Sequence, residues 1–459
     1  MAELLAHYAA RFEALAGSLG LDYDPVDFEL VPPAFMLEVS IYGLPVRMPH
    51  WSFGVRYIYQ LVQTRMGNSQ IFEVVFPGDP NRAYLADTNS VAENSLVTAH
   101  VLGHADFAKH NALFRRSRQE AGAHMVEQAA TRARRIERAI VTFGQGAVER
   151  VLDCALALEQ HIDVNQPMGR ARYPLRVPEG PQRAVDAFSS RFRDLPGEPV
   201  APSRPVVEQR ARVPARPEND LLWFIAQYAP ELEDWERDIF LAVREESFYF
   251  YPLFACQIMN EGWAAYWHAR LLREATFLPE SVYLDAIKSH SDVVSPFAGE
   301  RRLALQTNPY HLGFSIWERI IETQGVEGAR KIRDQEDDFG FVRNYLDANL
   351  AETLHLFVYE AERRGRIEIV SKDIESVHER LLAPKFNYGA PRVSVSEMKT
   401  DGTLVLTHAH RTDGRGLDLD RAVRVLDYIH RIWRRPVILH TVDFQGASRV
   451  LKAGPERSA

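Results

Sequence analysis

The sequence predicts a mainly α-helical protein, with a large helical domain followed by a small C-terminal α+β domain. Apolar residues recur at helical spacing along most of the chain, and near residue 390 the pattern changes to the alternation of β-strands. The 459 residues are 46% hydrophobic and 25% charged, a composition typical of a globular protein large enough for two domains. We therefore expect a helical domain over residues 1–388 and an α+β domain over residues 389–459.

The N-terminal part is predicted to contain amphipathic helices and one strand. Residues 1–20 carry apolar side chains at helical spacing, without the cationic start or the continuous apolar run of a signal peptide. A strand-like run over residues 70–75 precedes a turn rich in proline and glycine. Ser90 is predicted to cap a helix that extends to Asn111, because a serine in this position accepts a hydrogen bond from the first turn.

Helical periodicity continues through the middle of the chain and is interrupted by one long segment rich in proline and arginine. That segment, residues 178–217, is predicted to be a surface loop or linker because it lacks sustained periodicity. Helices are predicted over residues 123–140, 146–160, 219–228, 231–250, 258–273, 281–289, 314–323, 326–335 and 338–364.

The C-terminal part has the pattern of a small α+β unit. Residues 392–398 and 403–408 alternate between apolar and polar side chains around a Thr-Asp-Gly turn, which predicts a β-hairpin. A capped helix from about Asp418 to Trp433 and a strand over residues 436–442 follow. The expected order of elements is therefore ββαβ-like.

Composition and charge argue against several classes of protein. The formal net charge of -8 gives no reason to expect a nucleic-acid partner, because phosphate binding calls for a basic surface. No run of 18 apolar residues is present, so we expect no membrane insertion. The two cysteines, Cys154 and Cys256, lie in apolar helical stretches, which predicts buried thiols in a reducing, cytoplasmic setting.

His100 and His104 are the strongest candidates for chemistry. They lie four residues apart on one predicted helix, about 6 Å apart along its axis, so both imidazoles can face one ion. Glu261 begins another predicted helix and would add a carboxylate, which gives a two-histidine, one-carboxylate site with room for water. This set predicts a divalent metal ion, with zinc favoured and iron and manganese as alternatives.

These ligands alone do not determine the reaction. In the HExxH pattern of metallopeptidases a glutamate follows the first histidine and acts as the general base, whereas this chain has Val101 there. Hydrolysis would then require another carboxylate, and the candidates are Asp106, Glu245 and Glu246. His268 lies seven residues beyond Glu261, about 10 Å further along the helix, and is expected to support a ligand, bind a second ion or contact substrate.

Other interpretations of the same residues stay open. His290 and residues 308–313 could line the same cleft, although a proline turn at the start of the next helix also explains the second segment. The histidines could instead belong to a buried hydrogen-bond network in a non-enzymatic adaptor. A third alternative is a redox protein, since two histidines and a carboxylate also suit non-haem iron.

A series of motifs resembles the SpoVR (stage V sporulation protein R) family over nearly the whole chain. The motifs are MPHWSFG, AHVLGHADFAKHN, HMVEQAATRARRIE, EDWERDIFLAVREESFYFYP, QIMNEGWAAYWH, HSDVVSP, NPYHLGFSIWERI, DDFGFVRNYLD and the C-terminal unit from PRVSV to LDYIHRIWRRPVILHTV. The motif positions that carry over are His100, Gly103, His104, Asp106, Phe107, Asn260, Glu261, Gly262, Trp263 and His268.

The resemblance implies a role in assembling the spore cortex, a peptidoglycan layer, or the cell envelope, with a stress-response adaptor as the alternative. It suggests a peptide or a peptidoglycan-related substrate and leaves protein partners open. The paired histidines and the EGWA-Y segment also look like the zinc-binding halves of some helical metallopeptidases, where the glutamate is the third ligand. This second likeness implies a metallohydrolase.

Overall fold

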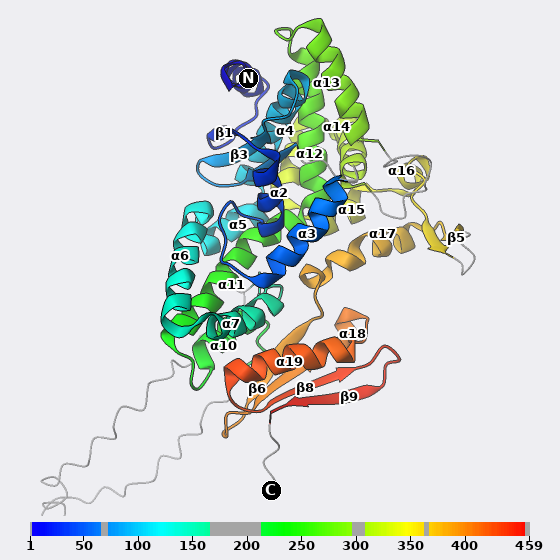
Figure 1. Ribbon diagram of the computed structural model, residues 1–459. Coiled ribbons are helices and arrows are strands. Elements are labelled where there is room, and N and C mark those ends of the chain that lie inside the picture. Colours follow the sequence, from blue (N-terminus) through cyan, green and yellow to red (C-terminus); the bar gives the residue numbers. More distant parts are fainter. Residues whose placement is uncertain (1, 66–71, 166–212, 296–307, 362–366, 455–459) are drawn as a thin grey trace, which may run out of the picture. The chain divides into compact units, whose positions relative to one another are not determined.

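The computed structural model describes residues 2–65, 72–165, 213–295, 308–361 and 367–454 (Figure 1). The chain forms two compact units, one of residues 1–160 and 238–390 and the other of residues 161–237 and 391–459. The predicted domains instead place residues 161–237 with the helical part. Helices dominate the first unit and a sheet with a helix dominates the C-terminal part, so the predicted fold class is confirmed.

A small three-stranded sheet lies near the start of the first unit. β1 (Val26–Val31) pairs in parallel with β3 (Asn81–Ala86), and β2 (Glu73–Phe76) pairs antiparallel with β3, in the order β1-β3-β2. The strand-like run over residues 70–75 predicted β2, whereas β1 was not predicted, although its residues VDFELV alternate. β3 was not predicted either, since it is buried at five of its six positions and therefore shows little alternation.

The rest of the first unit is largely helical. α14 (Pro309–Gln335) includes both predicted helices over residues 314–335 and has a non-helical backbone at Gly325, whose φ is 73°. The remaining elements are α1 (Ala2–Ser18), α2 (Pro33–Tyr42), α3 (Trp51–Arg65), α4 (Val91–His110), α5 (Ala112–Ala121), α6 (Met125–Phe143), α7 (Gln145–Ala157), α11 (Asp234–Ala255), α12 (Gln257–Glu274), α13 (Glu280–Val293), α14 (Pro309–Gln335), α15 (Asp338–Tyr345), α16 (Ala348–Thr353), β4 (Val358–Ala361), β5 (Ile367–Ser371), α17 (Ile374–Leu382) and the 3-10 helix η1 (Ala383–Gly389).

The core of the first unit is built around α12. α4 and α14 pack against α12, and Figure 1 shows these three helices running side by side. Trp263 and Trp267 of α12 are fully buried, and the ring of Trp263 lies 4.9 Å from that of Trp317 on α14. Large aromatic side chains between these helices give the core a substantial apolar area and fix the helices against one another.

The second unit contains the predicted hairpin and a longer sheet. β6 (Val393–Met398) and β7 (Leu404–His408) are antiparallel, as predicted, and β8 (Val437–Val442) joins β7 in parallel after α19 (Leu419–Trp433). A further strand, β9 (Ser448–Ala453), pairs with β8 and was not predicted. Only one of its six residues is buried, so its sequence lacks a clear apolar face. The unit also contains α10 (Leu221–Tyr228) and the short α18 (His410–Asp413).

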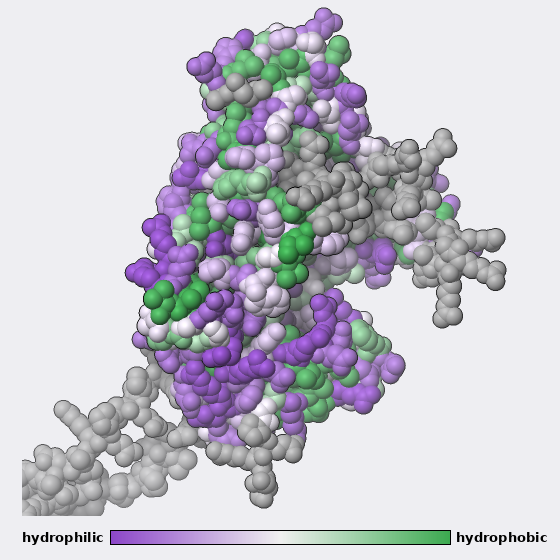
Figure 2. Space-filling model, viewed as in Figure 1, coloured by the Kyte–Doolittle hydropathy of each residue, from purple (hydrophilic) through white to green (hydrophobic). Residues whose placement is uncertain are grey.

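Helix α3 has an exposed apolar stripe. The side chains of Trp51, Val55, Ile58 and Tyr59 are 55%, 60%, 65% and 66% exposed, and their spacing places them along one side of the helix. Figure 2 shows hydrophobic atoms, in green, on the face of the molecule where α3 lies. An exposed apolar stripe of this kind is typical of a surface that contacts another molecule.

Among the described residues, no helix combines the length and the apolar composition needed to span a bilayer. Most of the predicted linker, residues 178–217, lies outside the described residues.

Candidate metal centre

α4 carries both candidate histidines into the core of the first unit. Its start is fixed by the predicted cap, because the Ser90 side chain accepts a hydrogen bond from the backbone N–H of Glu93 while the Glu93 carboxylate accepts one from the N–H of Ser90. Most residues of α4 are buried, and His100 is only 2% exposed. One turn separates His100 from His104, so both imidazoles lie on the face of α4 that packs against α12.

Two close helix crossings bring Glu261 beside these histidines. A Cβ atom on Gly103 would lie 2.7 Å from Cα of Ala264, and one on Gly262 would lie 2.2 Å from the carbonyl carbon of Gly313. α4, α12 and α14 approach this closely because the glycines have no side chain. Glu261, next to Gly262, therefore reaches the imidazoles with an ordinary side-chain length.

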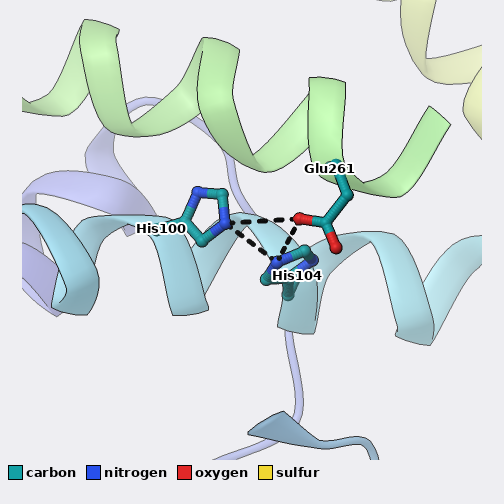
Figure 3. Close-up of side chains that lie close together, drawn as sticks. All are labelled: His100, His104 and Glu261. Atoms are coloured by element: carbon teal, nitrogen blue, oxygen red, sulfur yellow. Dashed lines mark hydrogen bonds and ion pairs between the residues drawn. The ribbon is translucent and has the colours of Figure 1, made fainter. Parts of the chain in front are cut away.

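The three candidate ligand atoms face one point (Figure 3). The Nε2 atoms of His100 and His104 lie 3.0 Å apart. Oε2 of Glu261 lies 3.6 Å from Nε2 of His100 and 3.4 Å from Nε2 of His104. All three atoms lie within 4.8 Å of one another, so the group could hold a metal ion. Oε2 of Glu261 is buried and has no hydrogen bond of ordinary geometry to any described residue.

The other ring nitrogen of each histidine has its own partner. Nδ1 of His104 lies 2.9 Å from Oδ1 of Asn260, and Nδ1 of His100 lies 2.9 Å from Nδ1 of His268. Nε2 of His268 lies 2.6 Å from Nδ1 of His290 on α13. His268 thus contacts the ring of His100 on the side away from Glu261. It reaches the site in this way although it lies two turns beyond Glu261 on α12.

Glu73 and Tyr310 complete the surroundings of the site. Oε1 of Glu73, on β2, lies 3.9 Å from Nε2 of His100. The ring of Tyr310, on α14, stacks on that of His100 with the centroids 6.0 Å apart. Tyr310 belongs to the segment expected to line the site, whereas Glu73 was not singled out. Its signal is a lone carboxylate within the apolar run Ile-Phe-Glu-Val-Val-Phe.

The charges in this cluster are strongly coupled. Burial raises the pKa of Glu261, but the neighbouring His104 and His100 outweigh burial and hold that pKa well below its usual range. Burial lowers the pKa of His104, but the charge of Glu261 outweighs burial and raises it. The charge of Glu261 and burial raise the pKa of Tyr310, which therefore stays a neutral phenol. Such a cluster favours a positive charge, on an imidazole or on a bound cation.

Comparison with known proteins assigns the family. Residues 1–389 match the family SpoVR like protein, and residues 391–444 match the SpoVR-like C-terminal domain. The chain belongs to the SpoVR family. Among curated proteins it is 28% identical to "Uncharacterized protein YcgB" of Escherichia coli (strain K12), over 99% of this chain and 95% of that protein. No solved structure matches the chain.

Asp106, a candidate base in this SpoVR-family chain, has other partners. Its Oδ2 accepts a hydrogen bond of 2.9 Å from the indole N–H of Trp263 and forms an ion pair with Arg333. Its Oδ1 accepts one of 3.0 Å from the backbone N–H of Asp22. Asp106 is 1% exposed, and these bonds tie α4 to α12 and α14. The structure therefore places it in an interhelical network rather than with the three ligand atoms.

The other two candidate bases also lie in separate ion pairs. Glu246 is buried and pairs with Arg47 at 2.6 Å, and Glu245 pairs with Arg132. Neither belongs to the group of ligand atoms formed by His100, His104 and Glu261. Of the four candidate catalytic residues, the structure thus brings only His268 to the candidate metal ligands.

Proposed function

We propose that this SpoVR-family chain is a metal-dependent hydrolase in which His100, His104 and Glu261 bind one divalent cation, with zinc favoured over iron and manganese. The observation that carries this proposal is the convergence of the two Nε2 atoms and Oε2 of Glu261, which are separated by 3.0, 3.4 and 3.6 Å. Ligands bound tetrahedrally at about 2.1 Å from zinc are about 3.4 Å apart, so the three separations suit one ion.

The hydrogen bonds of the two imidazoles support the same conclusion. A neutral histidine that binds a cation through Nε2 carries its proton on Nδ1. Nδ1 of His104 then donates to Oδ1 of Asn260, and Nδ1 of His100 donates to Nδ1 of His268, both over 2.9 Å. Such partners hold ligand rings in place and are typical of metal centres.

The chemistry follows from three protein ligands, which leave a fourth position open for water or substrate. A divalent cation supplies a Lewis acid that polarises a carbonyl oxygen and makes a bound water more acidic. Tyr310 is a neutral hydrogen-bond donor beside His100, suited to stabilise negative charge that develops on a substrate oxygen. We place the reaction in spore-cortex or cell-envelope assembly, on a peptide or peptidoglycan-related substrate, because the family resemblance implies this process.

Elemental analysis of the purified, untagged protein tests metal binding. We expect about one equivalent of zinc, iron or manganese in the wild type, and its loss from His100→Ala and Glu261→Ala. His110→Ala is the matched control, because His110 lies on α4 but pairs with Asp22 outside the site. Metal-free wild type that is fully folded, or variants that keep the metal and complement a deletion strain, would make us abandon the proposal.

A second candidate function is a non-enzymatic adaptor. The exposed stripe on α3 favours it, since Trp51, Val55, Ile58 and Tyr59 offer an apolar contact surface. The cluster around Glu261 would then be an ion-pair network with a protonated His104, which the raised pKa of His104 supports. Metal-dependent turnover of a substrate, together with no stable partner in a pull-down, would remove this candidate.

A further inference from the structure

Glu73 lies beside the proposed centre but is not one of its ligands. Its Oε1 is 3.9 Å from Nε2 of His100, yet Glu73 is absent from the group whose ligand atoms all lie within 4.8 Å of one another. Two ligands of one cation, each about 2.1 Å from it, are at most about 4.2 Å apart. Glu73 is therefore too far from at least one of the three candidate ligand atoms to share their cation, but its carboxylate lies beside the ring nitrogen of His100 that would bind that cation.

The backbone at Glu73 is fixed to the start of α4. The carbonyl oxygen of Phe72 accepts hydrogen bonds from the backbone N–H of Ala86 at 3.1 Å and from the side chain of Asn89 at 3.0 Å. The same Asn89 amide lies 3.2 Å from Oδ1 of Asn94, on the first turn of α4. Glu73 is thereby held in place relative to the helix that carries both histidines.

Burial raises the pKa of Glu73, and the charged groups that act on its carboxyl belong to the centre. They are His100, His104 and Glu261, and the Glu73 side chain is 19% exposed. A divalent cation with the carboxylates of Glu261 and Glu73 would be electrically neutral overall. A further anion in this largely buried place would leave a net negative charge with little solvent to stabilise it.

We propose that Glu73 accepts a hydrogen bond from a water molecule in the open position of the centre and restricts that position to uncharged ligands, foremost those with a proton to donate. Water, alcohols and amides meet this condition, whereas carboxylates and phosphates do not. The inference rests on the proposed metal binding and deepens it by naming the class of ligand. It also places a carboxylate beside the water. In the HExxH pattern a glutamate next to the first histidine supplies that carboxylate, whereas this chain has Val101 there.

The negative charge of Glu73 affects a neutral substrate and an anionic product differently. An amide or ester carbonyl is uncharged and is not repelled by Glu73 as it approaches the water in the open position. When that water adds to the carbonyl carbon and the amine or alcohol leaves, the carboxylate that forms is repelled by Glu73. The centre is therefore suited to cleaving neutral acyl groups, such as peptide bonds, and to releasing the acid that results.

Azide binding to the cobalt-substituted protein tests the inference, because azide is a small anionic ligand and cobalt(II) reports its ligands by visible absorption. We expect Glu73→Gln to keep its cobalt affinity within about threefold of wild type, by competition with a chelator, and to bind azide at least tenfold more tightly. Glu73→Asp keeps the charge and should retain the weak azide binding. Glu29→Gln, at an exposed position of β1 in the same sheet, should match the wild type.

Three other results would overturn the inference in distinguishable ways. Loss of cobalt from Glu73→Gln, as expected for His100→Ala, would make Glu73 a ligand. Equal azide affinity in wild type and Glu73→Gln, with circular dichroism showing both folded, would make Glu73 a bystander. A wild type that gives no cobalt spectrum before azide is added would overturn the metal centre itself, and this inference with it.

Discussion

The Nδ1 atoms of His100 and His268 lie 2.9 Å apart in the core of the first unit, and His268 continues to His290 through a 2.6 Å contact. If His100 binds a cation through Nε2, its Nδ1 donates to His268, and His268 must then donate from Nε2 to Nδ1 of His290. Three imidazoles in series thus couple the tautomer of His100 to those of His268 and His290.

His290→Ala should therefore weaken metal binding although His290 is not a ligand. Removing the acceptor at the outer end of the series frees His268 to adopt the other tautomer, and we expect a loss of about tenfold in affinity. Competition with a chromogenic chelator measures it, with His110→Ala as the control. Identical affinities in the two variants would show that the series does not support the centre.

Replacing Asp106 should destabilise the fold without removing the metal. Asp106→Ala leaves the guanidinium of Arg333, which is 4% exposed, with the more exposed Asp334 as its remaining carboxylate partner, and it also removes the acceptor of the Trp263 indole N–H, at a cost of about 3 kcal/mol in the free energy of unfolding. Urea denaturation measures the change, and Asp22→Asn, in an exposed pair with Lys109, should cost at most about 1 kcal/mol. A stable Asp106→Ala protein would contradict the role in the network.

Gly262→Ala should affect both stability and metal affinity. The added Cβ would meet the backbone of Gly313 at 2.2 Å, so α12 and α14 must move apart, which costs at least about 1–3 kcal/mol and displaces Glu261. Gly17→Ala on α1, where nothing lies within 4 Å of the new atom, should instead be neutral or stabilising by about 0.5–1 kcal/mol. Thermal unfolding measures the stability of the two variants, and chelator competition measures their metal affinity. Wild-type values for Gly262→Ala would refute the close-packing argument.

Asp338 should make stability rise on mild acidification. It is fully buried, and burial raises its pKa to about 6 despite Lys385 and two backbone N–H donors. The pKa of Asp338 is higher in the folded state than in the unfolded state. Its stabilising contribution to the free energy of unfolding is therefore fully present below about pH 4 and is lost as pH rises through about 6.

The corresponding measurement compares urea unfolding of wild type and Asp338→Asn at pH 7 and pH 5. Relative to the variant, the wild type should gain about 1 kcal/mol on going to pH 5. The comparison removes the contributions of the other titrating groups, which both proteins share. A constant difference between the two proteins would mean that the Asp338 carboxylate titrates at its ordinary pKa.

The sequence alone determined much of the fold, because local patterns dominate where helices are amphipathic or capped. The cap of α4 at Ser90, the helix break near Gly325 and the hairpin of β6 and β7 could all be predicted from residues near one another in the chain. β1, β3 and β9 were missed, since β1 and β3 pair across some fifty residues and β9 exposes most of its side chains. The helix predicted over residues 338–364 was wrong at its end, where β4 forms instead.

For the candidate centre, spacing on α4 was sufficient to pair His100 with His104, and the motif NEGWAAYWH indicated Glu261. Only the tertiary structure brought Glu73, His290 and Tyr310 to these residues, and only it showed Asp106, Glu245 and Glu246 in separate ion pairs. The physical reason is that helical spacing orders side chains within one element. Contacts between these side chains and residues of β2, α13 and α14 depend on how closely the helices cross at Gly103, Gly262 and Gly313. That distance is a property of the packed core.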